Sequence, residues 1–284
     1  MKIAVSSYSF SQAMRDGRMG ILDVIPKAKA LGYDGVEIVR GDQSDAEMTA
    51  LASLLRVQAK EHDLPIIAYM VGADFLKNDV DAEVKRLCHE AEIAALMGAP
   101  RMRHDATQGK DANGNPVPWE QALPVLADAY RRVTEYAAGL GVHTMIENHG
   151  YYAQDALRVK ALVEAVSHPN FGWLCDMGNF MCADEIPAES VKIAAPLAVH
   201  AHAKDFHAKK PGEYVPKQGF FPTRAGGALR GAIIGHGVVD VPECLKILRE
   251  AGYDNWLSVE FEGIEDCLMA LEADLKNLKE MLEK

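Results

Sequence analysis

A short unit of helix, glycine and strand recurs along this chain and constrains its fold more than any other feature. In each copy an apolar helix end is followed by glycine and then by a strand-like run; the clearest copies span 31–38, 97–104, 140–147 and 251–260. Glycine just past a helix adopts the left-handed conformation that ends the helix. Helices that alternate with strands predict parallel strands joined by right-handed crossovers.

The whole chain can be divided into eight such units. We expect strands near 3–8, 36–39, 65–70, 101–104, 143–147, 172–176, 198–204 and 256–261. We expect helices near 20–31, 44–62, 80–97, 119–139, 154–167, 184–195, 240–251 and 263–283. Eight strand–helix units that close on themselves form a TIM barrel, so we interpret residues 1–284 as a single α/β domain with a (β/α)₈ fold. A doubly wound open sheet is the alternative, but no Gly-x-Gly-x-x-Gly motif follows the first strand.

The composition restricts the classes of function. With 49% hydrophobic residues the chain can bury a large core, and a net charge of −11 argues against a nucleic-acid surface, which requires clustered Lys and Arg. No apolar segment is long enough for a signal peptide or a membrane span, so we expect a cytoplasmic protein without membrane contact. The five cysteines form no Cys-x-x-Cys pair and are interpreted as free thiols.

One predicted connection is unusually long. Residues 205–239 follow the seventh strand and are rich in glycine and proline. In a barrel enzyme a loop of this length usually covers the active site, so we expect a lid or a subunit contact. Residues 105–118 form a second, shorter candidate for such a loop.

Four strand ends carry one metal-binding side chain each: Glu147, Asp176, His202 and Glu260. Side chains alternate along a strand, and these four fall on the face opposite the apolar residues that pack against helices. They should therefore point into the barrel at the carboxyl ends of its strands, where barrel active sites lie. Inward carboxylates are costly to desolvate, so we expect a shared divalent cation. Three carboxylates and an imidazole suit Mn²⁺ best, with Mg²⁺, Co²⁺ and Zn²⁺ as the other candidates.

These segments resemble the xylose isomerase-like superfamily of sugar phosphate isomerase/epimerase-like barrels over essentially the whole chain. The motifs that carry the resemblance are Gly-His-Gly-Val-Val-Asp at 235–240 and those around the four polar residues: Ile-Glu-Asn-His, Cys-Asp-Met-Gly-Asn, His-Ala-His-Ala-Lys-Asp and Ser-Val-Glu-Phe. The resemblance implies that Glu147, Asp176, His202 and Glu260 are the metal ligands. It also implies a small sugar or keto-sugar substrate, with His200 one layer deeper as a core histidine.

The chain also departs from individual members of that superfamily. Ketose 3-epimerases carry Gly-Glu and a nearby Arg after the metal histidine, whereas this chain reads Lys-Asp-Phe-His at 204–207. Endonuclease IV-like relatives have a histidine three residues after the aspartate; Asn179 occupies that place here, which excludes a nuclease. Many members have Gly-Glu-Gly where this chain has Gly-His-Gly, so we expect His236 to face the site.

The expected chemistry is removal of a carbon-bound proton next to a carbonyl. As in related epimerases, Glu147 and Glu260 can shuttle that proton, which gives an isomerase or epimerase, the function that we favour. His149 shares the inward parity of Glu147 and is the other candidate base. A separate base suits a lyase that expels a β-substituent, as in the superfamily's keto-inositol dehydratases and its enzymes that split 3-keto-C-glycosides with a small partner subunit. A non-catalytic sugar-binding barrel is the third interpretation.

Four further residues are candidates for substrate contact. His104 ends the fourth predicted strand, Lys204 shares the face of His202, and His236 and Glu37 lie near other strand ends. We expect the assembly to be a homo-oligomer, or a hetero-oligomer with a small subunit.

Overall fold

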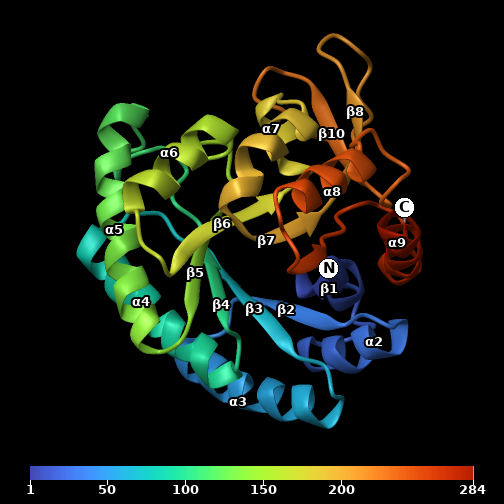
Figure 1. The fold of residues 1–284 in the computed structure, drawn as a ribbon, viewed down its shortest axis with the longest axis horizontal. Helices are drawn as coiled ribbons and strands as arrows, with labels where there is room; N and C mark the ends of the chain where they lie inside the picture. The colour runs from blue at the N-terminus through green and yellow to red at the C-terminus, as the bar shows by residue number, and fades with distance from the viewer. Residues whose placement is uncertain (284) are drawn as a thin grey trace.

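The computed structural model describes residues 1–283 and contains a closed barrel of eight parallel strands (Figure 1). Around the barrel the strands follow the order β1-β11-β7-β6-β5-β4-β3-β2. Their bounds are β1 (Lys2–Ser6), β2 (Gly35–Val39), β3 (Ile66–Val71), β4 (Arg101–His104), β5 (His143–Glu147), β6 (Phe171–Asp176), β7 (Ala198–Ala203) and β11 (Trp256–Val259). The predicted (β/α)₈ barrel is confirmed, and the predicted strands differ from the observed ones only at their ends.

The helices form a ring outside the strands (Figure 1). They are α1 (Ser11–Arg15), α2 (Val24–Leu31), α3 (Asp45–Glu61), α4 (Val80–Met97), α5 (Trp119–Gly139), α6 (Ala156–Val166), α7 (Pro187–Ala194), α8 (Val241–Glu250) and α9 (Cys267–Leu282). Short 3₁₀ segments are η1 (Ser7–Phe10), η2 (Ile21–Asp23), η3 (Asn179–Ala183) and η4 (Ala195–Leu197). None of the helices described in residues 1–283 is long and apolar enough to cross a bilayer.

The last helix begins later than its apolar periodicity predicts. The helix predicted near 263–283 would include Ile264, but this residue lies before α9 and is 50% exposed. The start is fixed by Asp266, whose Oδ1 accepts hydrogen bonds from the backbone N–H groups of Leu268 and Met269 at 3.1 and 3.2 Å. A side chain that accepts from these otherwise unpaired donors is a strong helix start signal.

The barrel interior is divided into an apolar and a polar part. Ala68, Met70, Met145 and Leu174 form a small buried cluster inside the strands. Met145 and Leu174 lie two residues before the carboxylates that end β5 and β6, so they share the inward face. The apolar cluster therefore leaves the carboxyl ends of the strands for polar side chains.

The long segment 205–239 is more ordered than its composition predicts. It contains a three-stranded antiparallel sheet of β8 (Asp205–Lys209), β9 (Phe221–Pro222) and β10 (Ala228–Ala232), in the order β8-β10-β9. Figure 1 shows β8 and β10 beside α7 and α8, at the edge of the barrel. The hydroxyl of Tyr151 donates a 2.6 Å hydrogen bond to the carbonyl of Pro222, which fastens this sheet to the connection after β5.

Asp205 anchors both ends of this segment. Its Oδ2 accepts hydrogen bonds from the backbone N–H groups of Gly235 and Gly237 at 2.9 and 2.8 Å, and its Oδ1 accepts from Val239 at 3.0 Å. A Cβ on Gly237 would lie 2.1 Å from Oδ1 of Asp205, so only glycine allows this approach. The Gly-His-Gly motif thus binds the buried carboxylate of Asp205 through its backbone N–H groups.

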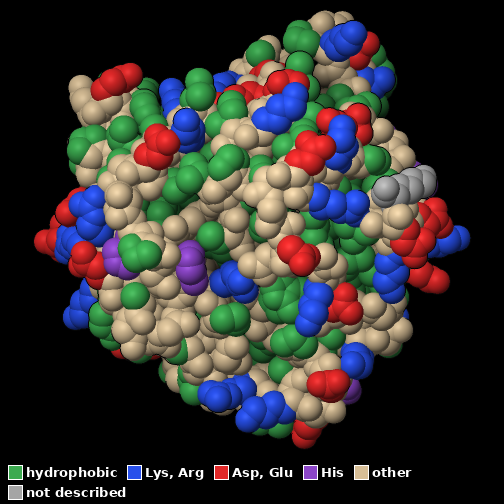
Figure 2. Space-filling view, viewed as in Figure 1, with side chains coloured by type: hydrophobic (Ala, Val, Ile, Leu, Met, Phe, Trp, Pro, Cys, Tyr) green, Lys and Arg blue, Asp and Glu red, His purple; other side chains and the backbone are tan. Residues whose placement is uncertain are grey.

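The surface and the cysteines agree with the expectations from composition. On the face drawn in Figure 2, Lys and Arg side chains are interspersed with Asp and Glu rather than gathered into one basic patch. All five cysteines are free thiols, and four of them are buried.

We predict that Asp205→Ala lowers the free energy of unfolding by about 2–4 kcal/mol, because three backbone N–H groups, that of Val239 being buried, lose a charged acceptor. Urea unfolding followed by circular dichroism measures the change. Asp42→Ala, at an exposed position, is the control and should shift stability by less than about 0.5 kcal/mol. Equal stability of the two variants would contradict the anchoring role.

Candidate metal centre

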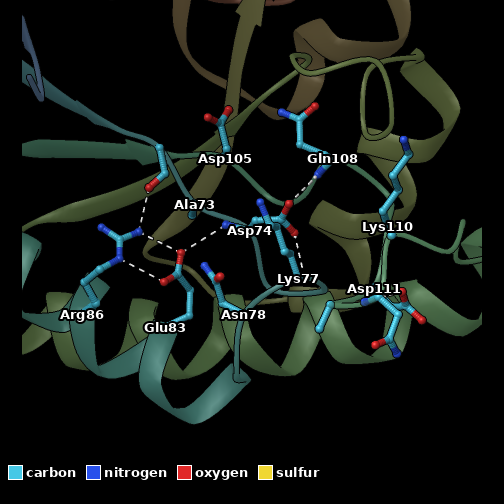
Figure 3. Close-up of a pocket in the computed structure, with 14 residues that line it drawn as sticks. Ala73, Asp74, Lys77, Asn78, Glu83, Arg86, Asp105, Gln108, Lys110 and Asp111 are labelled. Atoms are coloured by element: carbon cyan, nitrogen blue, oxygen red, sulfur yellow. Dashed lines mark hydrogen bonds and ion pairs between the residues drawn. The ribbon is translucent and has the colours of Figure 1, made fainter. Parts of the chain in front are cut away.

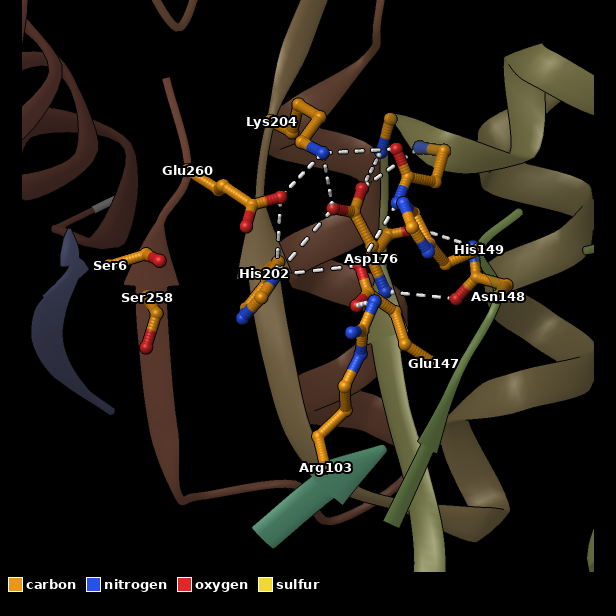
Figure 4. A network of polar contacts seen from close by, with 12 residues as sticks. Ser6, Arg103, Glu147, Asn148, His149, Asp176, His202, Lys204, Ser258 and Glu260 are labelled. Atoms are coloured by element: carbon orange, nitrogen blue, oxygen red, sulfur yellow. Dashed lines mark hydrogen bonds and ion pairs between the residues drawn. The ribbon is translucent and has the colours of Figure 1, made fainter. Parts of the chain in front are cut away.

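Four side chains from neighbouring strands meet at the carboxyl end of the barrel (Figure 4). Glu147 ends β5, Asp176 ends β6, His202 lies on β7, and Glu260 directly follows β11. Nδ1 of His202 lies 3.7 Å from Oε1 of Glu147, 3.6 Å from Oδ2 of Asp176 and 3.7 Å from Oε2 of Glu260. One ligand atom of each residue lies within 4.8 Å of the others. The structure thus brings together the four residues that the strand parity selected.

Two buried atoms of this cluster have no hydrogen-bond partner among the residues that the structure describes: Oδ2 of Asp176 and Nδ1 of His202. The two side chains are 0% and 1% exposed. An unsatisfied buried polar atom costs roughly 1–3 kcal/mol, so this pair calls for a shared partner. Three carboxylates and one imidazole are a donor set that a divalent cation of the Mn²⁺ type accepts, and the residues present therefore fit such an ion.

Glu37, deeper in the barrel, fixes the orientation of the His202 ring. Its Nε2 lies 3.0 Å from Oε2 of Glu37, and because a carboxylate only accepts, Nε2 must carry the proton. When His202 is neutral, as a metal ligand must be, the lone pair of Nδ1 faces the carboxylate cluster. A carboxylate that holds the second nitrogen of a histidine is the usual support of a metal ligand. Burial lowers the pKa of His202, but the charges of Glu37 and Glu260 outweigh this effect and hold that pKa well above its ordinary value.

Glu37 does not reach the substrate cavity, which corrects the expectation that it binds a sugar hydroxyl. It is fully buried and accepts hydrogen bonds from His200, His202 and the hydroxyl of Ser258. His200 is likewise 0% exposed and lies one layer below the cluster, as expected. Burial raises the pKa of Glu37, but the two imidazoles lower it well below its ordinary value. Glu37 is therefore placed to support His202.

Two cations neutralise part of the negative charge. Nζ of Lys204 lies 3.2 Å from Oδ2 of Asp176 and 2.5 Å from Oε2 of Glu260, and Nη2 of Arg103 lies 2.6 Å from Oε2 of Glu147. Burial raises the pKa of Glu260, but Lys204 and His202 outweigh it and bring that pKa to about 2. For Glu147 burial also raises the pKa, and Arg103 and His202 hold it well below its usual value. Both carboxylates are therefore ionised at neutral pH.

An asparagine connects these groups. Nδ2 of Asn179 donates to Oε1 of Glu147 at 2.9 Å, and Oδ1 of Asn179 accepts from Nζ of Lys204 at 3.0 Å. The backbone N–H of Asn179 also donates to Oδ1 of Asp176 at 2.8 Å. Asn179 thus contacts two members of the cluster and Lys204, a role that its position in the sequence did not reveal.

A cavity of about 280 Å³ lies over the cluster. It is lined by Tyr8, Val39, Met70, Val71, Gly72, Arg103, Asp105, Glu147, His149, His202, Lys204, Glu260 and Glu262. Lys204 and His149, both expected near the substrate, are among these residues. No residue of the described segment 205–239 lines the cavity, so that segment does not cover it in this structure.

His149 stands at the wall of the cavity with a carboxylate partner. Its Nδ1 lies 2.8 Å from Oδ1 of Asp105, and its side chain is 45% exposed. The same Asp105 oxygen lies 3.1 Å from Nη2 of Arg103. Removal from water lowers the pKa of His149, but the Asp105 carboxylate outweighs it and raises that pKa above its ordinary value. A continuous line of contacts thus runs from His149 through Asp105 and Arg103 to Glu147.

Two other expected substrate contacts lie elsewhere. His104 is 0% exposed and stacks on the ring of Tyr130 at a centroid distance of 4.2 Å, so it faces the helices. His236 is exposed in the turn before α8 and does not line the cavity.

Arg103 occupies the place that was expected of His104. The two residues are adjacent on β4, so only one of them can point into the barrel. The signal that would have identified Arg103 is Met102, an apolar residue that shares the helix-facing side with His104. Asp105, Tyr8 and Glu262 also line the cavity and were not selected from the sequence.

We predict that Glu147→Gln and His202→Ala each abolish binding of Mn²⁺, because each removes one ligand atom from the cluster. Metal content of the purified variants, measured by plasma mass spectrometry after loading and desalting, tests this. Glu61→Gln, on the exposed end of α3, is the control and should keep the metal content of the native protein. Unchanged metal content in both cluster variants would exclude the assignment.

A separate prediction concerns the residue beneath the cluster. Glu37→Gln should weaken Mn²⁺ affinity by about 10–100-fold without abolishing binding, because an amide holds His202 less firmly than a carboxylate. Competition with a fluorescent chelator measures the affinity. An affinity equal to that of the native protein would show that Glu37 only fills the core.

Comparison with known proteins agrees with this geometry. Residues 25–284 match the family described as xylose isomerase-like TIM barrel. The 3-oxo-isoapionate decarboxylase of Pectobacterium atrosepticum is 23% identical over 277 residues, which cover 94% of this chain and 90% of that protein. Two solved structures share the fold: the probable 3-DHS dehydratase AsbF from Bacillus anthracis (TM-score 0.75, 20% identity, 98% and 99% of the two chains) and the 3-keto-D-glucoside 4-epimerase from E. coli (TM-score 0.70, 16% identity, 99% of both chains). The chain belongs to the xylose isomerase-like TIM barrel family.

Proposed function

We propose that this protein is a divalent metal-dependent enzyme that removes a carbon-bound proton next to the carbonyl of a small sugar or keto-sugar. The observation that carries the proposal is the buried Nδ1 of His202, which has no hydrogen-bond partner among the described residues and lies 3.6 Å from Oδ2 of Asp176, beneath a cavity of about 280 Å³. The decarboxylase and the epimerase named above carry a 3-oxo and a 3-keto compound in their names, which supports carbonyl chemistry. We also propose a cytoplasmic location, which suits five unpaired cysteines.

The four ligands would be Glu147, Asp176, His202 and Glu260, with Mn²⁺ as the proposed ion. When bound, the ion would polarise the substrate carbonyl and stabilise the negative charge that develops on its oxygen. Lys204 lines the same cavity and donates to any substrate oxygen near Glu260. Arg103 keeps Glu147 ionised and in place.

Elimination, the lyase reaction, is the outcome that the geometry favours. Glu147 and Glu260 each contact a cation at 2.6 and 2.5 Å, which reduces their basicity. His149 is outside the ligand set, and its Nδ1 is held by Asp105, so Nε2 is left to transfer a proton. In a 3-keto-glycoside the C2 proton would pass to this base and the C–H electron pair would form a C1=C2 bond. The C1–O bond would then break with its electrons on oxygen, and the leaving oxygen would take up a proton.

Isomerisation or epimerisation, which the motifs favoured, is the second candidate. Glu147 and Glu260 flank His202 at 3.7 Å each and line the same cavity, so one could remove a proton and the other return it. This route needs one of the two carboxylates to leave its cation during turnover. Expulsion of a β-substituent by a separate acid–base residue avoids that step.

We predict that His149→Ala lowers turnover of a 3-keto-glycoside more than a hundredfold at unchanged metal content, because a positioned general acid–base contributes about 10²–10⁴-fold. Loss of deuterium to water from substrate labelled at C2, followed by NMR, detects proton removal whichever product forms. His89→Ala, on the exposed face of α4, is the control and should retain full activity. A loss below tenfold would exclude His149 as the base and favour the two-carboxylate epimerase.

A further inference from the structure

A second and larger cavity adjoins the proposed active site. Its volume is about 830 Å³, against about 280 Å³ for the cavity over the cluster. Figure 3 shows side chains from α4, from the connection after β3 and from the loop at 105–118 around it. The proposed reaction at a single sugar ring uses none of this space.

The two cavities are adjacent. Gly72 and Asp105 line both of them. Asp105 is also the residue that holds His149, through an Oδ1 to Nδ1 distance of 2.8 Å. The proposed acid–base pair therefore stands at the junction between the small cavity and the large one.

The loop at 105–118 forms one side of the large cavity and is held in place by its own contacts. The hydroxyl of Thr107 donates to Oδ1 of Asp74 at 2.6 Å, and Lys110 pairs with Pro116 in an antiparallel bridge. Gly109 has a φ of +78°, and a Cβ at this position would lie 2.1 Å from the ring of Tyr152. The cavity is thus preformed by packing and hydrogen bonds.

The acidic groups of the large cavity are already satisfied. Asp74 accepts from backbone N–H groups and from Thr107, while Glu83 pairs with Arg86 at 2.8 Å (Figure 3). Asp111 accepts from the loop that contains Asn115.

Several donors of the same cavity remain free. Lys77 and Lys110 form no ion pair within residues 1–283, and no hydrogen bond of the Gln108 side chain is found in that range. All three line the cavity together with Asn78 and Asn113. None of its lining residues is aromatic, and its apolar side chains are two alanines. Such a surface suits a neutral group with many hydroxyls far better than an aromatic ring, which prefers apolar and aromatic contacts.

We infer that the large cavity binds the second unit of a two-part substrate, a hydroxylated group such as another sugar, linked to the keto-sugar that occupies the small cavity. This inference rests on the proposed function for the identity of the first unit. The bond between the two units would lie beside Asp105 and His149, where the leaving oxygen of an elimination needs its proton. Loop residues Gln108 and Lys110 would then determine specificity for the second unit.

Calorimetric titration tests this inference without turnover. The chain of residues 1–284, with and without added Mn²⁺, is titrated with methyl 3-keto-glucoside, phenyl 3-keto-glucoside and a 3-keto-disaccharide of two glucose units. We expect the disaccharide to bind at least tenfold more tightly than the other two. In the double variant Gln108→Ala/Lys110→Ala this preference should fall about tenfold, the effect of roughly one lost charge-assisted hydrogen bond. Lys60→Ala, exposed on α3, is the control and should keep the preference.

The possible results separate the two proposals. Tight, loop-dependent binding of the disaccharide without any loss of deuterium from C2 would overturn the proposed reaction and leave the second site standing. Loss of deuterium from C2 with equal binding of the three compounds, tighter binding of the phenyl glucoside, or no binding of any of them would overturn the second site. A preference that the double variant retains would overturn the assignment to Gln108 and Lys110.

Discussion

The negative charge gathered at one end of the barrel is the constraint on which the rest of the site depends. Three carboxylates and one imidazole offer ligand atoms within 4.8 Å of one another, and like charges at such distances repel strongly away from bulk water. Lys204 and Arg103 reduce that repulsion from two sides, and Glu37 holds the imidazole from below. The ligand arrangement is thus supported by the protein itself. This explains why so many buried polar contacts surround it.

Much of this arrangement could be predicted from the sequence, because burial fixes the parity of long strands. On β5 and β6 apolar residues alternate with the inward ones, so Glu147 and Asp176 could be placed. On β4, only four residues long, three of the four are basic, and alternation alone did not separate Arg103 from His104. On β2 the pairing with β3 shifts register between Val36 and Glu37, an irregularity that strand patterns do not reveal. The antiparallel sheet within 205–239 was likewise hidden by its glycines and prolines.

His149 is not part of the cluster, and this arrangement suggests how barrels of one family can yield different products. The family accounts for the fold, whereas in the proposed reaction the product depends on which group carries the proton. His149, the proposed acid–base residue, is held by Asp105 outside the cluster. The relatives named above include a decarboxylase, a dehydratase and an epimerase, so one fold is compatible with several reactions.

The loop at 105–118 has a consequence for how such proteins diversify. It follows β4, whereas the four cluster residues belong to β5, β6, β7 and the end of β11. Beyond Asp105, its contacts with Asp74 and Tyr152 do not involve that cluster. Substitutions at 106–118 can therefore accumulate without disturbing the ionised carboxylates, whereas Asp105 is connected to Glu147 through Arg103. If the loop binds the second unit as proposed, selection or an engineer can change that recognition while the proposed reaction is retained.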